Sequence, residues 1–267
     1  MALPVVARPP TPRNRVVQQA GQCPEGYLIS EGDSFAYDLG PLDPPLSLTG
    51  YLPAWDVERR RADLAPIVAW ALRKIRSMGY PADSLGSLHR HLDPRQALTV
   101  TQALTAASLE PELRGHVGHA VLSAIPELPR DRFWIQTRAH FRILVPDDGV
   151  APVPPHTDFG FGHTLDERNV WLSLTDAEGT AALHLLSLAD SLSWMSRTGR
   201  LYGVLDGAPE IPPVPTRAGE VLLFTPLHVH RGRAPTAGRC RVSVDVRLVP
   251  VPAAMVDLTF SPLRSDP

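Results

Sequence analysis

Hydrophobic positions in the first half of the chain recur at the three- and four-residue spacing of amphipathic helices. The clearest pattern lies in 56–78, where Asp63 can cap a helix and Pro66 fits only in its first turn. The residues before Pro66 are therefore expected to form a separate short helix. Two further helices are predicted at 94–108 and 111–125, the second with an apolar side made of Leu113, Val117, Ala120, Val121 and Ala124.

From Asp131 onward the pattern changes to short apolar or alternating runs separated by Pro, Gly and Asp, which is typical of strands and turns. The predicted strands lie in 133–145, 170–174, 181–186, 221–224 and 240–249. Helices followed by strands predict an α+β chain in which helices of about 56–125 cover one outer face of antiparallel strands of about 131–250. The Gly- and Pro-rich stretch 197–217 is expected to be an inserted loop that can serve as a lid.

Two of the predicted strands have one apolar face and one polar face. In the last strand Val242, Val244 and Val246 oppose Arg241, Ser243 and Asp245. In the strand at 169–175 the apolar face opposes Asn169, Trp171 and Ser173. Such alternation fits a sheet with one face in water, and it equally fits a sheet with its apolar face under helices and its polar face lining a cavity.

Composition describes an ordinary globular protein. The chain has 267 residues, 43% of them hydrophobic and 20% charged, with a formal net charge of −2. These values exclude a disordered chain and give no indication of a nucleic-acid partner. We expect one domain over 25–267, preceded by an extended or mobile segment over 1–24 that is rich in Pro and Arg. The 29 prolines favour loops and short strands over a helical bundle.

Neither a membrane anchor nor export is expected. The sequence has no apolar run of roughly 18 residues, and its first residues lack the apolar stretch of a secretory signal. The two cysteines, Cys23 and Cys240, cannot form a disulfide framework and have no zinc-binding spacing. We therefore expect a reduced, cytoplasmic protein.

Metal-ligand chemistry is indicated by Pro154-Pro-His-Thr-Asp-Phe-Gly160. His156 and Asp158 lie two apart, so on a strand they share a face about 6–7 Å apart, a distance at which both can bind one metal ion. Further along, a turn and a buried strand lead to His228 and His230. Eleven residues after His230, Arg241 and then Ser243 place a cation and a hydroxyl on one face of another strand.

This combined pattern resembles the non-haem iron(II)/2-oxoglutarate-dependent oxygenases, over roughly 133–250. The likeness is to their phytanoyl-CoA-hydroxylase-like branch, which includes ectoine hydroxylase and oxygenases of aminoglycoside and orthosomycin pathways. The resemblance implies a double-stranded β-helix core (jelly-roll, cupin-like) backed by the helices of the N-terminal half. It also implies that His156, Asp158 and His230 bind iron(II), with His230 favoured over His228 because it sets the expected eleven-residue interval to Arg241.

The residue types fit the chemistry that this family performs. Two imidazoles and one carboxylate leave open positions on iron(II) for a keto acid and for dioxygen. The far carboxylate of 2-oxoglutarate needs a cationic partner, which Arg241 with Ser243 can supply. The run Gln136-Thr-Arg138-Ala-His140 resembles a Q-x-R-x-N run that contacts the co-substrate, with His140 in place of the Asn. Halogenating relatives in this family carry a small residue at the position of Asp158, so halogenation is not expected.

Substrate contacts are expected from the polar stretch after the metal motif. His163 and Arg168 bound this stretch, for which a solvated turn is the alternative. Trp171 fits either the core or a cavity wall. His228, if it is not a ligand, is a further candidate for contact with a substrate.

The sequence favours an oxygenase that abstracts hydrogen from a small polar metabolite, such as a sugar, an aminocyclitol or another antibiotic-pathway intermediate. Hydroxylation and oxidative cyclisation both fit, with release of succinate and CO2. One alternative is a metal-dependent hydrolase or isomerase on a cupin-like barrel, which leaves Arg241 and Ser243 unexplained. The other is a ligand-binding barrel without catalysis.

Overall fold

The computed structural model describes residues 56–128, 133–146, 153–161, 163, 167–198, 203–204, 209–236 and 238–250. The segment predicted over 1–24 lies outside these residues. The described helices are α2 (Ala65–Ser77), α3 (Pro94–Ala107), α4 (Pro111–Ala124) and α5 (Leu188–Thr198), together with the short 3₁₀ helices η1 (Leu85–Arg90), η2 (Asp158–Phe161) and η3 (Gly179–Ala181). No helix among the described residues is long and apolar enough to span a bilayer.

The strands form two antiparallel sheets. The first runs β1 (Glu58–Arg61), β9 (Glu220–Phe224), β5 (Arg168–Ser173), β11 (Arg241–Pro250), β2 (Phe133–Ile135), with β3 (His140–Leu144) also paired to β11. The second runs β7 (Gly203–Val204), β4 (His156–Thr157), β10 (His230–Arg231), β6 (Leu183–Leu185), β8 (Pro213–Val214). The predicted α+β class with antiparallel sheets is confirmed.

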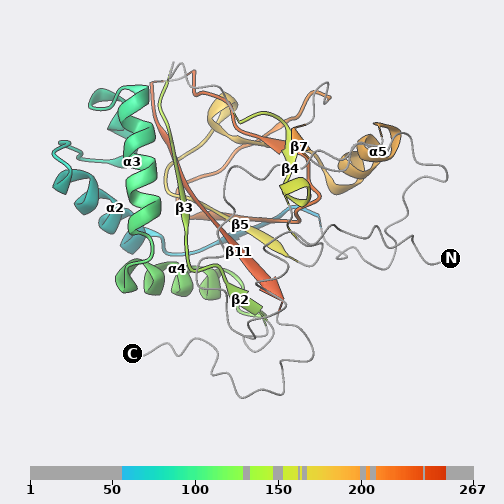
Figure 1. Cartoon of the computed structure of the whole chain (residues 1–267), viewed down its shortest axis with the longest axis horizontal. Helices are drawn as coiled ribbons and strands as arrows, with labels where there is room; N and C mark the ends of the chain where they lie inside the picture. Colours follow the sequence, from blue (N-terminus) through green and yellow to red (C-terminus); the bar gives the residue numbers. More distant parts are fainter. Residues whose placement is uncertain are drawn as a thin grey trace.

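Helices α2, α3 and α4 cover one face of the first sheet, and the second sheet lies on its other side (Figure 1). The main hydrophobic core fills the space under these helices. It includes Trp70 and Ile75 from α2, Val100 and Leu104 from α3, and Val242, Val244 and Val246 from β11. The apolar face of β11 is therefore under helices, as the cavity interpretation of its alternation required.

The first predicted helix begins later than expected. Instead of a short helix before Pro66, residues Glu58–Arg61 form β1, which pairs with β9 at the edge of the first sheet. The reason is that Glu58-Arg-Arg-Arg61 has no apolar helical face, whereas its backbone can complete an open strand edge. Arg59 also pairs with Glu220 of β9 at 2.6 Å. Helix α2 then starts at Ala65, whose N–H donates to Asp63 Oδ1.

Two other boundaries also differ from the prediction. The run 133–145 is two strands, β2 and β3, which pair with successive parts of β11. The stretch 197–217 is only in part a loop, because Gly203–Val204 and Pro213–Val214 are strands of the second sheet. Its residues 199–202 and 205–208 lie outside the described part of the chain.

Hydroxyl side chains of α3 and of Ser108 just after it accept hydrogen bonds from the edge of β3 that is not paired with β11. The N–H groups of Ala139, Phe141 and Ile143 donate to the hydroxyls of Ser108, Thr105 and Thr101 at 3.0, 3.1 and 3.2 Å. Alternate strand residues thus meet one side of the helix. This arrangement satisfies amide donors that would otherwise be buried without an acceptor.

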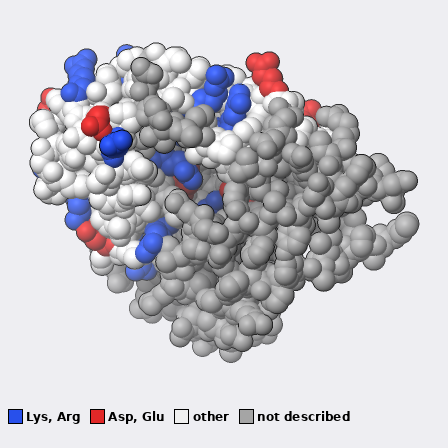
Figure 2. All heavy atoms as spheres, turned by 45° about the horizontal axis from the view of Figure 1, so that its top comes forward, with Lys and Arg blue, Asp and Glu red and all other residues white. Residues whose placement is uncertain are grey.

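Charged side chains of both signs are dispersed over the face of the molecule shown in Figure 2. Exposed side chains form ion pairs, including Arg73 with Glu112 and Arg217 with Glu178. Exposed pairs of this kind contribute little to stability. The fold therefore depends on the core and on its buried hydrogen bonds.

We predict that Thr105→Val lowers the free energy of unfolding by about 1–3 kcal/mol, because the Phe141 N–H loses its acceptor in a buried position. Chemical denaturation measures this change. Thr99→Val is the matched control, since the Thr99 hydroxyl is exposed and bonds only to the Arg95 carbonyl of its own helix. Equal losses in the two variants would show that the contact with β3 contributes nothing.

Candidate metal centre

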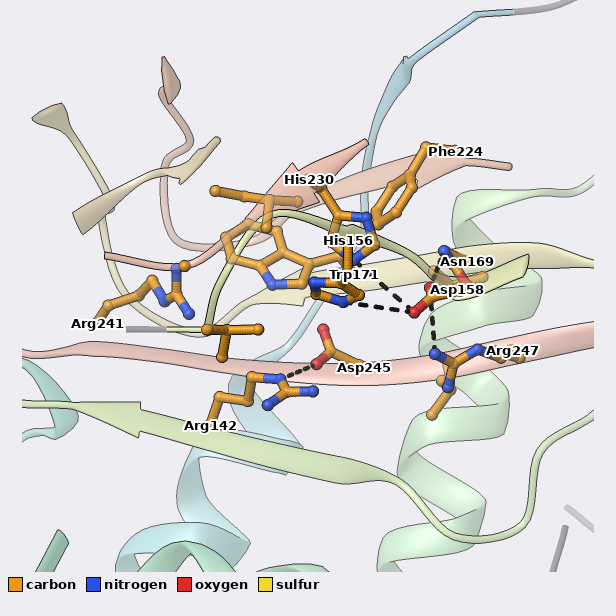
Figure 3. Close-up of a pocket in the computed structure, with 15 residues that line it drawn as sticks. Arg142, His156, Asp158, Asn169, Trp171, Phe224, His230, Arg241, Asp245 and Arg247 are labelled. Carbon is orange, nitrogen blue, oxygen red and sulfur yellow. Dashed lines mark hydrogen bonds and ion pairs between the residues drawn. The ribbon is translucent and has the colours of Figure 1, made fainter. Parts of the chain in front are cut away.

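Three side chains that can bind a metal converge at the second sheet (Figure 3). His156 on β4 and His230 on β10 face each other directly in the strand register, and Asp158 begins η2 just after β4. Asp158 Oδ1 lies 3.7 Å from His156 Nε2 and 3.9 Å from His230 Nε2. The three ligand atoms lie within 4.8 Å of one another, and all three residues are buried. A single cation can reach all three atoms.

Both histidines are held with their Nε2 atoms available to a metal. His156 Nδ1 donates to the Pro154 carbonyl at 2.8 Å, and His230 Nδ1 donates to the His228 carbonyl at 2.9 Å. A carbonyl only accepts, so Nδ1 carries the proton and Nε2 keeps its lone pair. Burial, and after it the neighbouring His230, lowers the pKa of His156 to about 3. His156 is therefore neutral near pH 7, the form that binds a metal.

Asp158 is ionised in spite of its burial. Burial alone would raise the pKa of this carboxyl, but the Arg247 guanidinium and the surrounding histidines hold it well below its usual range. Its Oδ2 accepts from Asn169 Nδ2 at 2.6 Å and lies 3.2 Å from Arg247 Nη2. The other oxygen, Oδ1, faces the two histidines. The donor set of two imidazoles and one carboxylate suits iron(II).

The structure places His230, and not His228, beside the other ligands. His228 Nδ1 accepts from the Thr225 N–H at 3.1 Å, so His228 Nε2 carries the proton and donates to Asp56 Oδ1 at 2.9 Å. Its side chain is completely buried and does not line the cavity at the metal centre. The ring bonds to Asp56 instead of facing the cavity, and a substrate contact through His228 stays a prediction.

One cavity connects the three candidate ligands with Arg241. Strand β11 supplies a row of charged residues to its wall, and Arg241 and Arg247 lie at opposite ends of it in Figure 3. Trp171 and Phe224 provide aromatic walls. The other lining residues are Arg142, Val153, Asn169, Val170, Leu183, Gly232, Asp245 and Val246.

Arg241 is a buried cation aimed into this cavity. Its side chain is among the largest that are fully buried, with 1% relative exposure. Its Nη1 donates to the Ala181 carbonyl at 3.4 Å, while no carboxylate of the described residues lies within ion-pair distance of it. Burial lowers its pKa to about 10, which still leaves the guanidinium charged near pH 7. Arg241 Nε and the hydroxyl of neighbouring Ser243 are buried without a hydrogen-bond partner in the described part of the structure.

The other residues predicted to bind the co-substrate, Gln136, His140 and Ser243, do not line the cavity. Gln136 Nε2 and His140 Nε2 contact each other at 3.3 Å, and neither residue lines the cavity. Burial, and after it Arg247, lowers the pKa of His140 to about 4. Ser243 follows Arg241 on the same face of β11 but is not part of the cavity wall.

Of the residues expected to contact a substrate, only Trp171 lines the cavity. His163 is buried against Glu167, with 2.6 Å between His163 Nδ1 and Glu167 Oε2. Arg168 lies over the Phe133 ring, 5.6 Å from its centroid. Neither side chain lines the cavity as described, and contact of either one with a substrate stays a prediction.

Several lining residues received no role from the sequence, above all Arg142, Asn169, Asp245 and Arg247. Asn169 and Asp245 belong to polar strand faces that the alternation identifies. Arg247 continues the same two-residue period beyond Asp245. Extending this period to the end of β11 would have found Arg247, whereas the contact of both Asn169 and Arg247 with Asp158 depends on how the two sheets meet.

Comparisons with known proteins give only distant likenesses. No protein-family model and no curated protein matches the chain. Among solved structures, the non-heme monooxygenase ThoJ is 16% identical with a TM-score of 0.46, covering 72% of each chain. The alpha-ketoglutarate-dependent carbocyclase SnoK from nogalamycin biosynthesis is 15% identical with a TM-score of 0.44, covering 72% of this chain and 78% of its own.

A third similar structure is EvdO2 from Micromonospora carbonacea var. aurantiaca, complexed with 2-oxoglutarate. It is 16% identical with a TM-score of 0.45, and the match covers 74% of this chain and 88% of that one. Likenesses at these TM-scores and identities do not by themselves assign an activity. The function is therefore argued from the residues of the site.

We predict that His230→Ala abolishes tight binding of divalent metal, because it removes one of the three converging ligands, whereas His228→Ala retains it. The His228 change should instead lower thermal stability, since it leaves Asp56 without its buried partner. Titration calorimetry with nickel(II) and thermal melts of both variants separate the two effects. Loss of metal binding in His228→Ala with retention in His230→Ala would reverse the assignment.

Proposed function

We propose that the protein is an iron(II)/2-oxoglutarate-dependent oxygenase and that its two sheets form a double-stranded β-helix of the jelly-roll type. His156, Asp158 and His230 would hold the iron, and Arg241 with Ser243 would hold the far carboxylate of 2-oxoglutarate. The observation that carries this proposal is the buried guanidinium of Arg241, which has no carboxylate partner among the described residues and lies in the same cavity as the three candidate ligands.

A buried arginine without a carboxylate partner is energetically unfavourable. Removing a charge from water costs several kcal/mol unless an opposite charge or good hydrogen bonds compensate. Arg241 has one long hydrogen bond to a carbonyl and no ion pair among the described residues. An anionic ligand would compensate this charge, and a guanidinium can bind a carboxylate through two parallel hydrogen bonds.

The ligand best suited to both ends of the cavity is a keto acid with a second carboxylate. Its keto end would bind the metal, and its far carboxylate would reach Arg241 and the Ser243 hydroxyl. When bound together, iron(II) and 2-oxoglutarate supply the activation of dioxygen for attack on a substrate C–H bond, with release of succinate and CO2. The protein's own residues position these groups, and the apolar walls formed by Trp171 and Phe224 limit access of water.

The substrate that we propose is a small polar metabolite, such as a sugar, an aminocyclitol or another antibiotic-pathway intermediate, that undergoes hydroxylation or oxidative cyclisation. Polar recognition is supported by the charged part of the cavity wall. Arg142 and Asp245 pair there at 2.7 Å between Nε and Oδ2, and both side chains keep part of their surface exposed, 43% and 22%. Such a partly exposed pair can exchange hydrogen bonds with hydroxyl or amino groups of a substrate.

A metal-dependent hydrolase or isomerase could use the same three ligands with zinc or manganese as a Lewis acid. That function would not require a buried guanidinium next to the metal centre. A ligand-binding protein without catalysis would not require a metal site. The position of Arg241 therefore favours the oxygenase over both alternatives.

We predict that anaerobic iron(II) with 2-oxoglutarate gives the weak visible charge-transfer band of a metal-bound keto acid, and that neither component gives it alone. Arg241→Met should raise the 2-oxoglutarate concentration that gives half of the maximal band intensity about 10- to 100-fold, because the hydrogen bonds between the guanidinium and the far carboxylate are lost. Titration followed by absorption measures the shift. Iron(II) affinity measured in the same variant is the control and should not change.

An unchanged 2-oxoglutarate requirement in Arg241→Met would remove Arg241 from the co-substrate site. Binding of iron(II) by the wild type without any keto-acid band would refute the oxygenase and favour the hydrolase.

We predict that Asp158→Ala abolishes succinate formation from 2-oxoglutarate in air, since the metal loses its only anionic protein ligand. The variant should still fold but with lower stability, because Arg247 and Asn169 lose their buried carboxylate partner. Succinate is measured by chromatography and folding by circular dichroism. Normal succinate formation in Asp158→Ala would exclude Asp158 from the metal site.

A further inference from the structure

We propose that Asn169 is a positioning residue for the metal centre: its amide holds Oδ2 of Asp158 away from the ion, so that the carboxylate binds metal through Oδ1 alone. This inference rests on the proposed metal site, but it does not depend on 2-oxoglutarate or on oxygenase activity. Neither the sequence pattern nor the three candidate ligands assign a role to Asn169.

The geometry of Asp158 divides its two oxygens between different partners. Asn169 Nδ2 lies 2.6 Å from Oδ2, whereas Oδ1 is the oxygen that faces His156 and His230, at 3.7 and 3.9 Å. A carboxylate only accepts hydrogen bonds, so the amide nitrogen and not the amide oxygen of Asn169 must face it. Both residues are buried, with 5% relative exposure for Asn169 and 6% for Asp158. Water therefore competes little for this contact.

Asn169 approaches the metal centre from the opposite sheet. It lies on β5 in the first sheet, paired in register with Arg247 of β11 and Phe224 of β9. His156 and His230 belong to the second sheet, and Asp158 follows β4 of that sheet directly. Because β5 is a central strand with neighbours on both sides, its backbone is fixed. The amide is thus held on a rigid element, as precise positioning requires.

The consequence concerns the number of open positions on the ion. A carboxylate can bind a cation through one oxygen or through both. If Asp158 used both oxygens, it would take a position that a co-substrate or a water molecule needs. The hydrogen bond from Asn169 to Oδ2 keeps this oxygen from turning toward the ion. Residues that hydrogen-bond to a metal ligand in this way typically contribute 10- to 100-fold to metal affinity.

Arg247 also contacts Oδ2, at 3.2 Å, but it is a less suitable test. Its removal would delete a hydrogen bond and would also delete a positive charge that repels the incoming cation. These two changes act in opposite directions on metal affinity. Asn169 is neutral, so replacing it changes the orientation of the carboxylate without changing the charge of the site.

The experiment is a cobalt(II) titration of the metal-free full chain, followed by calorimetry and by visible absorption. Asn169→Leu keeps the approximate size of the side chain and removes the donor, and Asn169→Ala removes the donor with the smallest steric risk. Ser173→Ala is the matched control. Ser173 lies on the same strand and its buried hydroxyl donates to the Thr175 carbonyl at 2.8 Å, but it does not line the cavity.

We expect the cobalt(II) dissociation constant to rise about 10- to 100-fold in both Asn169 variants and to stay unchanged in Ser173→Ala. The visible band of bound cobalt(II) should also change in intensity in the Asn169 variants, because its intensity depends on the number of ligand atoms. A general loss of stability would not produce this spectral change in protein that is still folded and loaded.

An unchanged affinity and spectrum in the Asn169 variants would overturn the proposal. An equal loss of affinity in Ser173→Ala, or unfolding of both Asn169 variants in circular dichroism, would assign Asn169 a structural role and also overturn it. The proposal is independent of the oxygenase reaction. A wild type that binds cobalt(II) but gives no keto-acid band with iron(II) would refute the oxygenase and leave the role of Asn169 standing.

Discussion

The alternation of side chains along β11 is the constraint on which the rest of the structure depends. Val242, Val244 and Val246 are buried in the core under the helices, and Arg241 and Arg247 lie on the opposite face at the cavity. A shift of one residue in register would place guanidinium groups in the core and valines at the metal centre. The packing that stabilises the fold therefore also fixes which charges enter the cavity.

The second determining feature is the contact between the two sheets at Asp158. The histidines come from neighbouring strands of one sheet, and the groups that hold the distal oxygen of Asp158 come from β5 and β11 of the other. The arrangement of the three candidate ligands is thus coupled to the packing of one sheet on the other. The backbone carbonyls of Pro154 and His228 also orient the imidazoles of His156 and His230, through hydrogen bonds to their Nδ1 atoms.

Electrostatics divide the cavity into regions with different tasks. At one end Asp158 is balanced by Arg247, and in the middle Asp245 is balanced by Arg142. At the other end Arg241 has no carboxylate partner in the described part of the chain. The uncompensated charge thus lies where an anionic co-substrate would be held, in a buried environment where charge interactions are stronger than in water. Of the charged groups in the cavity, Arg241 is therefore the one best suited to bind an anionic ligand.

The sequence alone determined helices α2, α3 and α4, the change to strands after them, and the two polar strand faces, because these features depend on local periodicity. It also indicated His156 and Asp158 as candidates through their spacing, and His230 through the resemblance to a family. It did not predict helix α5 between the strands. Only the tertiary structure decided that Glu58–Arg61 is an edge strand and that His228 turns toward Asp56. The contacts of Asn169 and Arg247 with Asp158 were decided in the same way, since these partners are distant in sequence and meet only when the two sheets pack.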